Sequence, residues 1–288
     1  MSAPVAALPA AAGSVPGVTV ARVVASEWTK LTSLRSTYWL AAFTVAVSGG
    51  LTSLAANASS VDPGFQPLGS LTDGVLLAQV GLLVLGVLVG TGEFSTGTSR
   101  STFTAVPRRL PVLAAQTVVT GASALLVALL AVGAAVLGVL PAAASRGIAV
   151  DLGADGVPHV MAGMVLFLVG IALLGLALGA LLRRSVPAVT AAVLLVLVLP
   201  IALMLASDVG TSPMTSAEPP GPPALSVVST VVTLLPSGAG SLLMTAADSG
   251  GVDGAPDLGP WGGGLVLAAW ILVLLGAAAV RLRARDAV

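Results

Sequence analysis

The chain has 288 residues, of which 56% are hydrophobic and 8% charged, and its formal net charge is zero. Soluble domains carry about 25% charged residues, so this composition excludes a water-soluble globular fold and gives no reason to expect nucleic acid as a partner. Because the chain has no Cys and one His, it also excludes disulfides, cysteine nucleophiles and zinc sites built from several Cys or His. The composition predicts an all-α, polytopic membrane protein.

The first segment is expected to be a disordered tail, because residues 1–18 are rich in Ala, Pro and Gly and lack a basic stretch. We expect a single transmembrane domain over residues 19–288. Residues 19–37 have the pattern of an amphipathic helix. Its apolar residues near one face are Val20, Val24, Trp28 and Leu31. This pattern predicts a helix that lies in the membrane interface, and the alternative is a plain soluble helix before the first span.

Six segments are long and apolar enough to cross a membrane, since a helix needs about 20 apolar residues to span the hydrocarbon. These predicted spans are residues 38–56, 74–92, 113–140, 160–182, 186–206 and 262–280. None of them contains Asp, Glu, Lys or Arg. The third is unusually long, and we predict one long or tilted helix there, with Pro141 near its end.

Basic residues lie almost entirely on one side of these spans. With an even number of spans both termini share a side, and that side holds all of the 12 Lys and Arg residues except Arg146. The positive-inside rule places that side in the cytoplasm. We therefore expect a multi-pass protein of the cell membrane with both termini cytoplasmic.

Between the fifth and the last predicted span lies an apolar run that is too short to cross a bilayer. The run, residues 224–235, follows a Pro-rich break and is followed by Pro236, Ser237 and Gly238. A re-entrant or surface-lying half-helix on the outer side is therefore predicted before the last span.

Few residues offer chemistry. The only Lys, Lys30, is followed by Leu31 and Thr32, so the Gly-Lys-Ser/Thr of a phosphate-binding P-loop is absent. We expect no catalytic, cofactor or metal site in this chain and no enzymatic activity of its own. His159, at the outer end of the fourth span, is expected to be an interfacial polar tip, with a pH sensor as the alternative.

Inside the predicted spans the polar groups are Gln79, Gln116 and scattered Ser and Thr. We expect them to hydrogen-bond between helices or to the backbone instead of binding a solute. Two Gly-x-x-x-Gly motifs, one in the second span and one in the fourth, would each allow another helix to approach closely, and helix packing is their expected role. Their glycines are Gly86, Gly90, Gly175 and Gly179.

Two segments on the cytoplasmic side resemble the signatures of a known family. Residues 27–39 contain Glu27-Trp28-Thr29-Lys30-Leu31-x-Ser33-Leu34-Arg35-Ser36-Thr37-x-Trp39. Residues 93–109 contain Glu93-Phe94-x-x-Gly97-Thr98-x-Arg100 and Pro107-Arg108-Arg109. In these motifs, and in its six spans, the chain resembles type-2 ATP-binding-cassette (ABC) permease subunits of the actinobacterial type. One departure is Gln116, where many relatives carry Lys.

The resemblance implies an exporter in which two permease halves, identical or paralogous, each dock a separate P-loop ATPase that binds ATP and Mg²⁺. The residues implied in coupling to the ATPase are Glu93, Gly97, Thr98, Arg100, Pro107 and Arg108. The interfacial helix beside them contributes Glu27, Trp28, Lys30 and Arg35. The apolar spans suggest an amphipathic or lipid-like solute.

Two other functions remain open from the sequence. A non-transporting membrane scaffold or sensor would explain the spans, although not the paired cytoplasmic motifs. An integral-membrane enzyme acting on lipids lacks a convincing site, because His159 has only Asp151 and Asp155 as near neighbours in the sequence. An adjacent reading frame for a P-loop ATPase would favour the exporter, and its absence would favour the scaffold.

Overall fold

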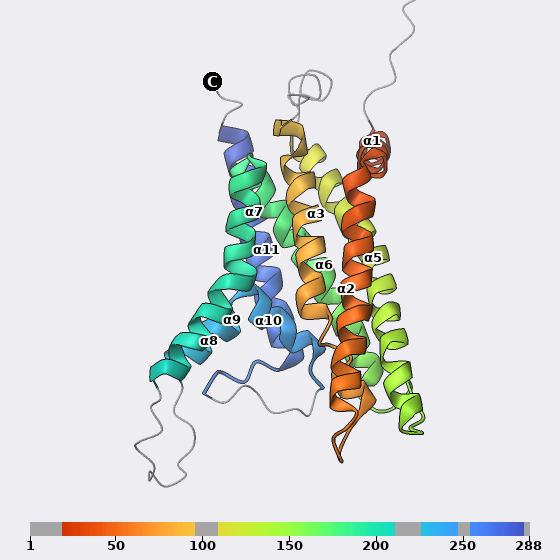
Figure 1. Ribbon diagram of the computed structural model, residues 1–288. Helices are drawn as coiled ribbons and strands as arrows, with labels where there is room; N and C mark the ends of the chain where they lie inside the picture. The colour runs from red at the N-terminus through yellow and green to blue at the C-terminus, as the bar shows by residue number, and fades with distance from the viewer. Residues whose placement is uncertain (1–18, 96–108, 211–225, 247–253, 285–288) are drawn as a thin grey trace, which may run out of the picture.

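The structure is a computed structural model that describes residues 19–95, 109–210, 226–246 and 254–284, so the predicted tail lies outside the described residues (Figure 1). The regular elements in these ranges are all helical. The α-helices are α1 Val20–Ser33, α2 Arg35–Ser59, α3 Val75–Ser95, α5 Arg109–Ser145, α6 Val157–Leu182, α7 Ser185–Val193, α8 Leu199–Gly210, α9 Val227–Leu234, α10 Pro236–Ser241 and α11 Gly259–Ala284.

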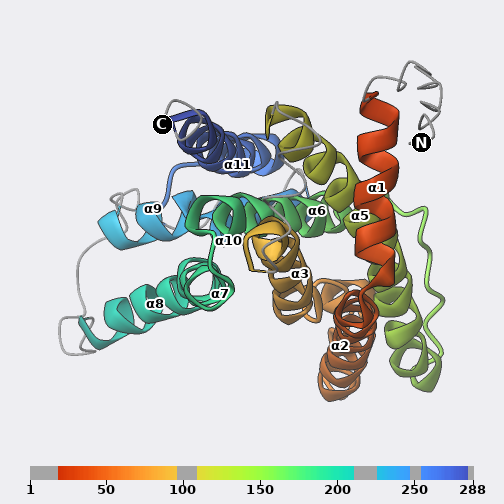
Figure 2. The same ribbon diagram turned by 90° about the horizontal axis from the view of Figure 1, so that it is seen from above.

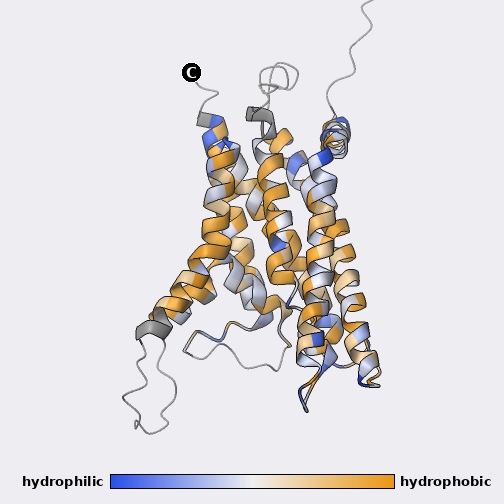
Figure 3. Ribbon diagram, viewed as in Figure 1, coloured by the Kyte–Doolittle hydropathy of each residue, from blue (hydrophilic) through white to orange (hydrophobic). Residues whose placement is uncertain are grey.

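Six segments in the described residues are long and apolar enough to cross a membrane, as predicted. They are Arg35–Ser59, Pro67–Gly92, Leu110–Ser145, Val157–Leu182, Ser185–Ala206 and Gly259–Arg283. Figure 3 shows apolar residues along these helices and most hydrophilic residues near their ends. The chain is therefore an all-α, multi-pass membrane protein.

The backbones of α3 and α6 are in direct contact. A Cβ atom added to Gly86 would lie 1.9 Å from the carbonyl oxygen of Ala172, and one added to Gly175 would lie 2.2 Å from that of Leu83. One turn further along, Gly90 and Gly179 make the same kind of approach. Close helix packing at both Gly-x-x-x-Gly motifs is therefore confirmed, and the structure adds that the two motifs pack on each other.

A second seam joins α2 to α5. The hydroxyl of Ser48 on α2 donates a hydrogen bond of 2.9 Å to the carbonyl oxygen of Ala131 on α5. Beside it, a Cβ added to Gly138 would lie 2.5 Å from the carbonyl oxygen of Gly49. Small residues and a buried hydroxyl therefore hold this pair together, as expected where neither helix gains hydrophobic energy by leaving lipid.

The third span is one helix, as predicted, but it continues through Pro141 to Ser145. With 37 residues, α5 is about 55 Å long, whereas the hydrocarbon is about 30 Å thick. The helix is therefore long enough to extend beyond the hydrocarbon or to tilt within it.

The ends of the bundle differ in charge. One end carries α1, the last turns of α3, α6 and α11, and the first turns of α5 and α7 (Figure 1, Figure 2). Every Lys and Arg of the described residues lies at this end except Arg146, which follows α5 at the other. We call the first the basic end and the second the opposite end.

The fifth span is not one regular helix. A π-helical segment, Leu194–Val198, separates α7 from α8, and the N–H of Leu199 reaches the carbonyl of Leu194. Pro200 has no N–H to give to the preceding turn, and the wider π turn accommodates that loss. α7 packs against α3 and α6, whereas α8 leaves the bundle and runs beside α9 (Figure 2).

Before α11 the chain forms a broken pair, α9 and α10, bent by 72°. At its start, the N–H of Ser226 donates to the carbonyl of Gly254, just before α11, at 2.7 Å. At its break, Trp270 Nε1 donates to the carbonyl of Leu234 at 2.9 Å, about 16 Å along α11. The pair therefore starts at the opposite end, turns beside the middle of α11 and returns to the start of α6, which is the path of a re-entrant segment.

The half-helix predicted before the last span is confirmed as α9, and the structure adds α10 after it. The apolar run 224–235 was expected to form one half-helix, with Pro236 ending it. Pro236 does follow the end of α9, but it is also the first residue of α10, a position that suits proline because its missing N–H would have no partner there.

We predict that Gly86→Ala lowers the free energy of unfolding by about 1–3 kcal/mol, because the added methyl group overlaps the backbone of α6. Thermal unfolding of the purified protein in detergent measures the effect. Gly133→Ala is the matched control, since a Cβ at that α5 position meets nothing within 4 Å. Equal midpoints for the two variants would contradict the packing described for α3 and α6.

Candidate functional site

α1 lies across the basic end of the bundle. In the side view α1 is seen end-on, and in the view from above it lies at a large angle to α2 (Figure 1, Figure 2). Val23 on α1 packs with Val112 and Ala115 in the first turns of α5. The helix is therefore seated on the part of α5 that directly follows the segment between α3 and α5.

The face of α1 that packs on the bundle is only partly the apolar face of the sequence pattern. Its buried residues are Val23, Glu27 and Leu31, at helical spacing, whereas Val20 and Trp28 are exposed. Of the four apolar residues assigned to one face, Leu31 alone is fully buried. Apolar residues of α1 that the bundle leaves exposed are what a helix in the membrane interface would present to lipid, so that location stays a prediction.

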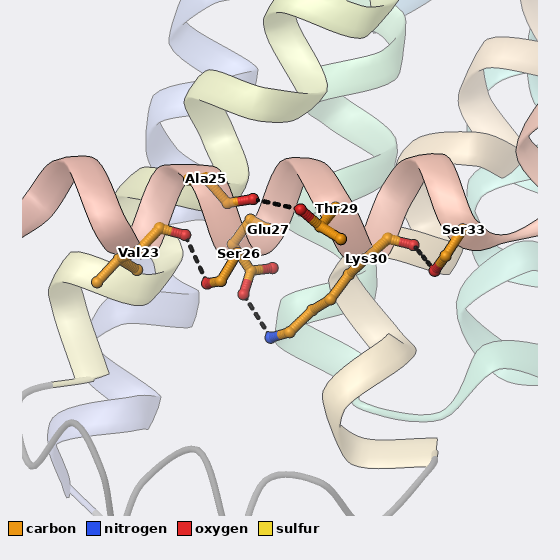
Figure 4. A network of polar contacts seen from close by, with 7 residues as sticks. All are labelled: Val23, Ala25, Ser26, Glu27, Thr29, Lys30 and Ser33. Carbon is orange, nitrogen blue, oxygen red and sulfur yellow. Dashed lines mark hydrogen bonds and ion pairs between the residues drawn. The ribbon is translucent and has the colours of Figure 1, made fainter.

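Glu27 is a charged residue on the buried face of α1. Its side chain is 6% exposed, and its carboxylate accepts a hydrogen bond of 2.5 Å from Lys30 Nζ, one turn along the helix (Figure 4). The Lys30 side chain is 46% exposed, so water screens this pair and its stabilising effect is about 0–1 kcal/mol. The pair keeps a buried carboxylate compensated at the seam with α5.

The hydroxyl groups of α1 bond to the carbonyls of their own helix. Ser26 donates to Val23 at 2.7 Å and Thr29 donates to Ala25 at 2.9 Å (Figure 4). These side chains are thereby used within the helix. These hydroxyl groups therefore stabilise α1 itself.

A tight elbow joins α1 to α2. Leu34 is the one residue between them, with extended backbone angles. The hydroxyl of Thr37 donates to the carbonyl of Leu31 at 2.9 Å, and that of Tyr38 donates to the carbonyl of Thr32 at 3.0 Å. Side chains of α2 thus cap the last turn of α1, and they fix the angle between the two helices.

The proposed coupling segment joins the end of α3 to the start of α5, on which α1 packs. Glu93 lies in the last turn of α3, and α5 starts at Arg109, directly before the residues that contact α1. The side chain of Glu93 lies outside the described residues. So do five further predicted coupling residues, Gly97, Thr98, Arg100, Pro107 and Arg108. The structure therefore places the helix that contains Trp28 and Lys30 on the α5 end of this segment, and Arg35 is exposed at the start of α2.

The polar groups at depth bond largely to the backbone, as expected. Gln79 Nε2 donates to Leu76 on its own helix at 2.6 Å, and Thr44 donates to Leu40 at 2.9 Å. Gln116 is buried on α5, directly after Ala115 in the seam with α1. These contacts give the polar side chains a structural role.

Two features lie at the opposite end. The ring of His159 packs edge-on against Trp261, with the ring centroids 6.0 Å apart, so His159 joins the starts of α6 and α11. An apolar groove of about 450 Å³ runs between the same helices and includes Leu173, Leu243 and Trp261 in its lining. Within the described ranges, His, Cys, Asp and Glu form no group of three or more that could hold a metal ion.

No family model matches the chain, and no curated protein matches it either. The function must therefore be argued from the residues and from their arrangement. The site that these define is a surface at the basic end, made of α1, its elbow and the two helix ends that flank residues 96–108.

We predict that Thr37→Val with Tyr38→Phe loosens the elbow, since each lost hydroxyl removes a hydrogen bond worth about 1 kcal/mol. Because the chain has no Cys, spin labels can be placed through Ala21→Cys on α1 and Ala42→Cys on α2. The distance distribution between the labels should broaden.

Thr29→Val is the control for this measurement, because its hydroxyl bonds within α1 and does not bridge the elbow. A distribution that stays as narrow in the double variant as in this control would show that the hydroxyls do not hold α1.

Proposed function

We propose that the chain is the membrane-spanning permease subunit of an ABC exporter in the cell membrane, with both termini in the cytoplasm. A separate P-loop ATPase would bind ATP and Mg²⁺ and hydrolyse the nucleotide. Residues 93–109 would receive the movement of that ATPase, and α1 would support them. The seating of α1 on the first turns of α5 is the observation that carries this proposal.

The contact matters because the two segments that resemble the family signatures are far apart in the sequence. One includes α1, and the other joins α3 to α5. Their meeting at one end supports a common docking surface for a cytoplasmic partner. The concentration of Lys and Arg at that end supports its cytoplasmic location through the positive-inside rule.

The spans differ in how much of their surface is buried, and this difference supports α3 as the helix that passes on a movement of the ATPase. α3 and α6 have 67% of their most apolar windows buried, while the fifth span has 17% and α2 and α11 have 22% each. A push on the last turn of α3 would therefore act on the best-packed helix pair. The exposed spans leave apolar faces for pairing with a second permease, identical or paralogous.

The solute is proposed to be amphipathic or lipid-like. Within the described part of the spans the side chains are apolar, apart from amides and hydroxyls that are largely bonded to the backbone. The groove between α6 and α11 has the chemistry to admit an acyl chain, because its lining residues are apolar. An ion would lose its hydrating water there and find no polar groups in its place, so an ion is a less suitable solute.

The partner can be tested by purifying the tagged chain from its native membranes in mild detergent and identifying co-purifying proteins by mass spectrometry. A stoichiometric P-loop ATPase is expected. If well-folded protein is recovered repeatedly without an ATPase, even after cross-linking, the exporter proposal fails and the scaffold or sensor function takes its place.

We predict that Glu93→Ala leaves membrane insertion intact and lowers the ATP hydrolysis of the reconstituted complex about tenfold, since a hydrogen bond to a charged group contributes about 1.5 kcal/mol or more. Glu27→Ala should act more mildly, because that carboxylate bonds to Lys30 on its own helix. Asp151→Ala at the opposite end is the control. Wild-type hydrolysis by a well-expressed Glu93→Ala complex would contradict the role of Glu93.

A further inference from the structure

Four arginines gather at the basic end on elements that the proposed coupling does not use. Arg183 ends α6, Arg184 precedes α7, and Arg281 and Arg283 belong to the last turn of α11. We call Arg183, Arg184, Arg281 and Arg283 the arginine cluster. Its position is at the ends of two membrane-spanning helices, where the hydrocarbon gives way to the lipid headgroups.

Two members of the cluster hold α6 and α11 together. Arg281 Nη1 donates to the carbonyl oxygen of Leu181, and Arg183 Nη2 donates to the carbonyl oxygen of Arg281 at 3.3 Å. Carbonyls in the last turn of a helix lack partners within it, so each guanidinium caps the neighbouring helix. This exchange places two positive charges side by side.

The residue that ends α6, Arg183, has a strained backbone conformation, and its side chain makes the hydrogen bond to α11. Arg183 has a φ of 60°, in the left-handed region that residues with a side chain rarely adopt. Glycine would occupy this position without strain, and its side chain could not cap α11. The strained residue therefore carries the guanidinium that reaches Arg281.

Within the described ranges no acidic side chain pairs with Arg184 or Arg281. Of the described acidic side chains, Glu27 is the one at the basic end, and it lies on α1, bonded to Lys30. Arg281 uses one of its five N–H groups for Leu181, and the side chain of Arg184 makes no hydrogen bond to a described residue. Several N–H donors therefore remain available to an anion.

Apolar surface adjoins these donors. Val186, two residues after Arg184, is 76% exposed, and Val280, directly before Arg281, is 67% exposed. An anionic phospholipid matches this combination, because its phosphate accepts hydrogen bonds from guanidinium groups while its acyl chains cover apolar surface. A free inorganic anion would use only the charged part.

We propose that the arginine cluster binds the phosphate of an anionic phospholipid from the adjacent leaflet, whose acyl chains lie against the exposed faces of α7 and α11. The bound lipid accepts hydrogen bonds from Arg184 and Arg281 and stabilises the contact between α6 and α11. This binding is independent of the proposed transport function, because none of its residues belongs to the coupling segment or to α1.

The test uses the purified full-length chain in detergent, titrated separately with dioleoylphosphatidylglycerol, dioleoylphosphatidylcholine and inorganic phosphate. The thermal midpoint and native mass spectrometry report binding. Phosphatidylglycerol is expected to raise the midpoint and to be retained, because a ligand that binds the folded state stabilises it. Equal effects of the two lipids, or an equal effect of inorganic phosphate, would overturn the proposal.

Variants locate the binding. Arg281→Gln and Arg184→Gln should each weaken phosphatidylglycerol binding about fivefold, the effect of losing one basic residue near a membrane surface. Arg184→Gln disturbs no described hydrogen bond, so it remains informative if Arg281→Gln loosens α11. Arg35→Gln, an exposed arginine on α2 at the same end, is the control. An equal loss in the control would overturn the site.

Discussion

The backbones of α3 and α6 approach so closely that a methyl group would not fit between them at Gly86 or Gly175. In lipid there is little hydrophobic gain from joining two apolar helices, so contact of this kind has to supply the attraction. The other spans are arranged around the pair. α2 and α5 pack on one side, while α7 and α11 pack on α6 and leave broad faces exposed.

α3 and α6 run in the same direction, and both end at the basic end. The best-packed pair of helices is therefore directly accessible from that end. The segment after α3 starts there, and the seam of Val23 with Val112 brings α1 to the same place. α1 is held by the capping hydroxyls of Thr37 and Tyr38 at its elbow. A force applied at this end would reach the best-packed pair through α3 and the first span through the elbow.

Local pattern predicted much of this fold from the sequence. Stretches without charge located the six spans, and the Gly-x-x-x-Gly motifs indicated where helices could approach closely, although not that the two motifs pack on each other. Contacts between distant residues could not be predicted in this way. The hydrogen bond from Trp270 to the break at Leu234, and the packing of Val23 on α5, depend on neighbours remote in the sequence. At the candidate site, α1 was therefore predicted as an amphipathic helix, but its packing on α5 was not predicted.

The central claim is that an ATPase docks at the basic end of this bundle. Single cysteines provide the test, because the chain has none of its own: Ser33→Cys on the exposed side of α1, and Ala149→Cys in the exposed loop after α5. A cysteine-to-lysine cross-linker applied to native membranes should join a P-loop ATPase to Ser33→Cys and not to Ala149→Cys. Cross-linking at Ala149→Cys alone, or at neither site when both cysteines react with a maleimide, would contradict the account.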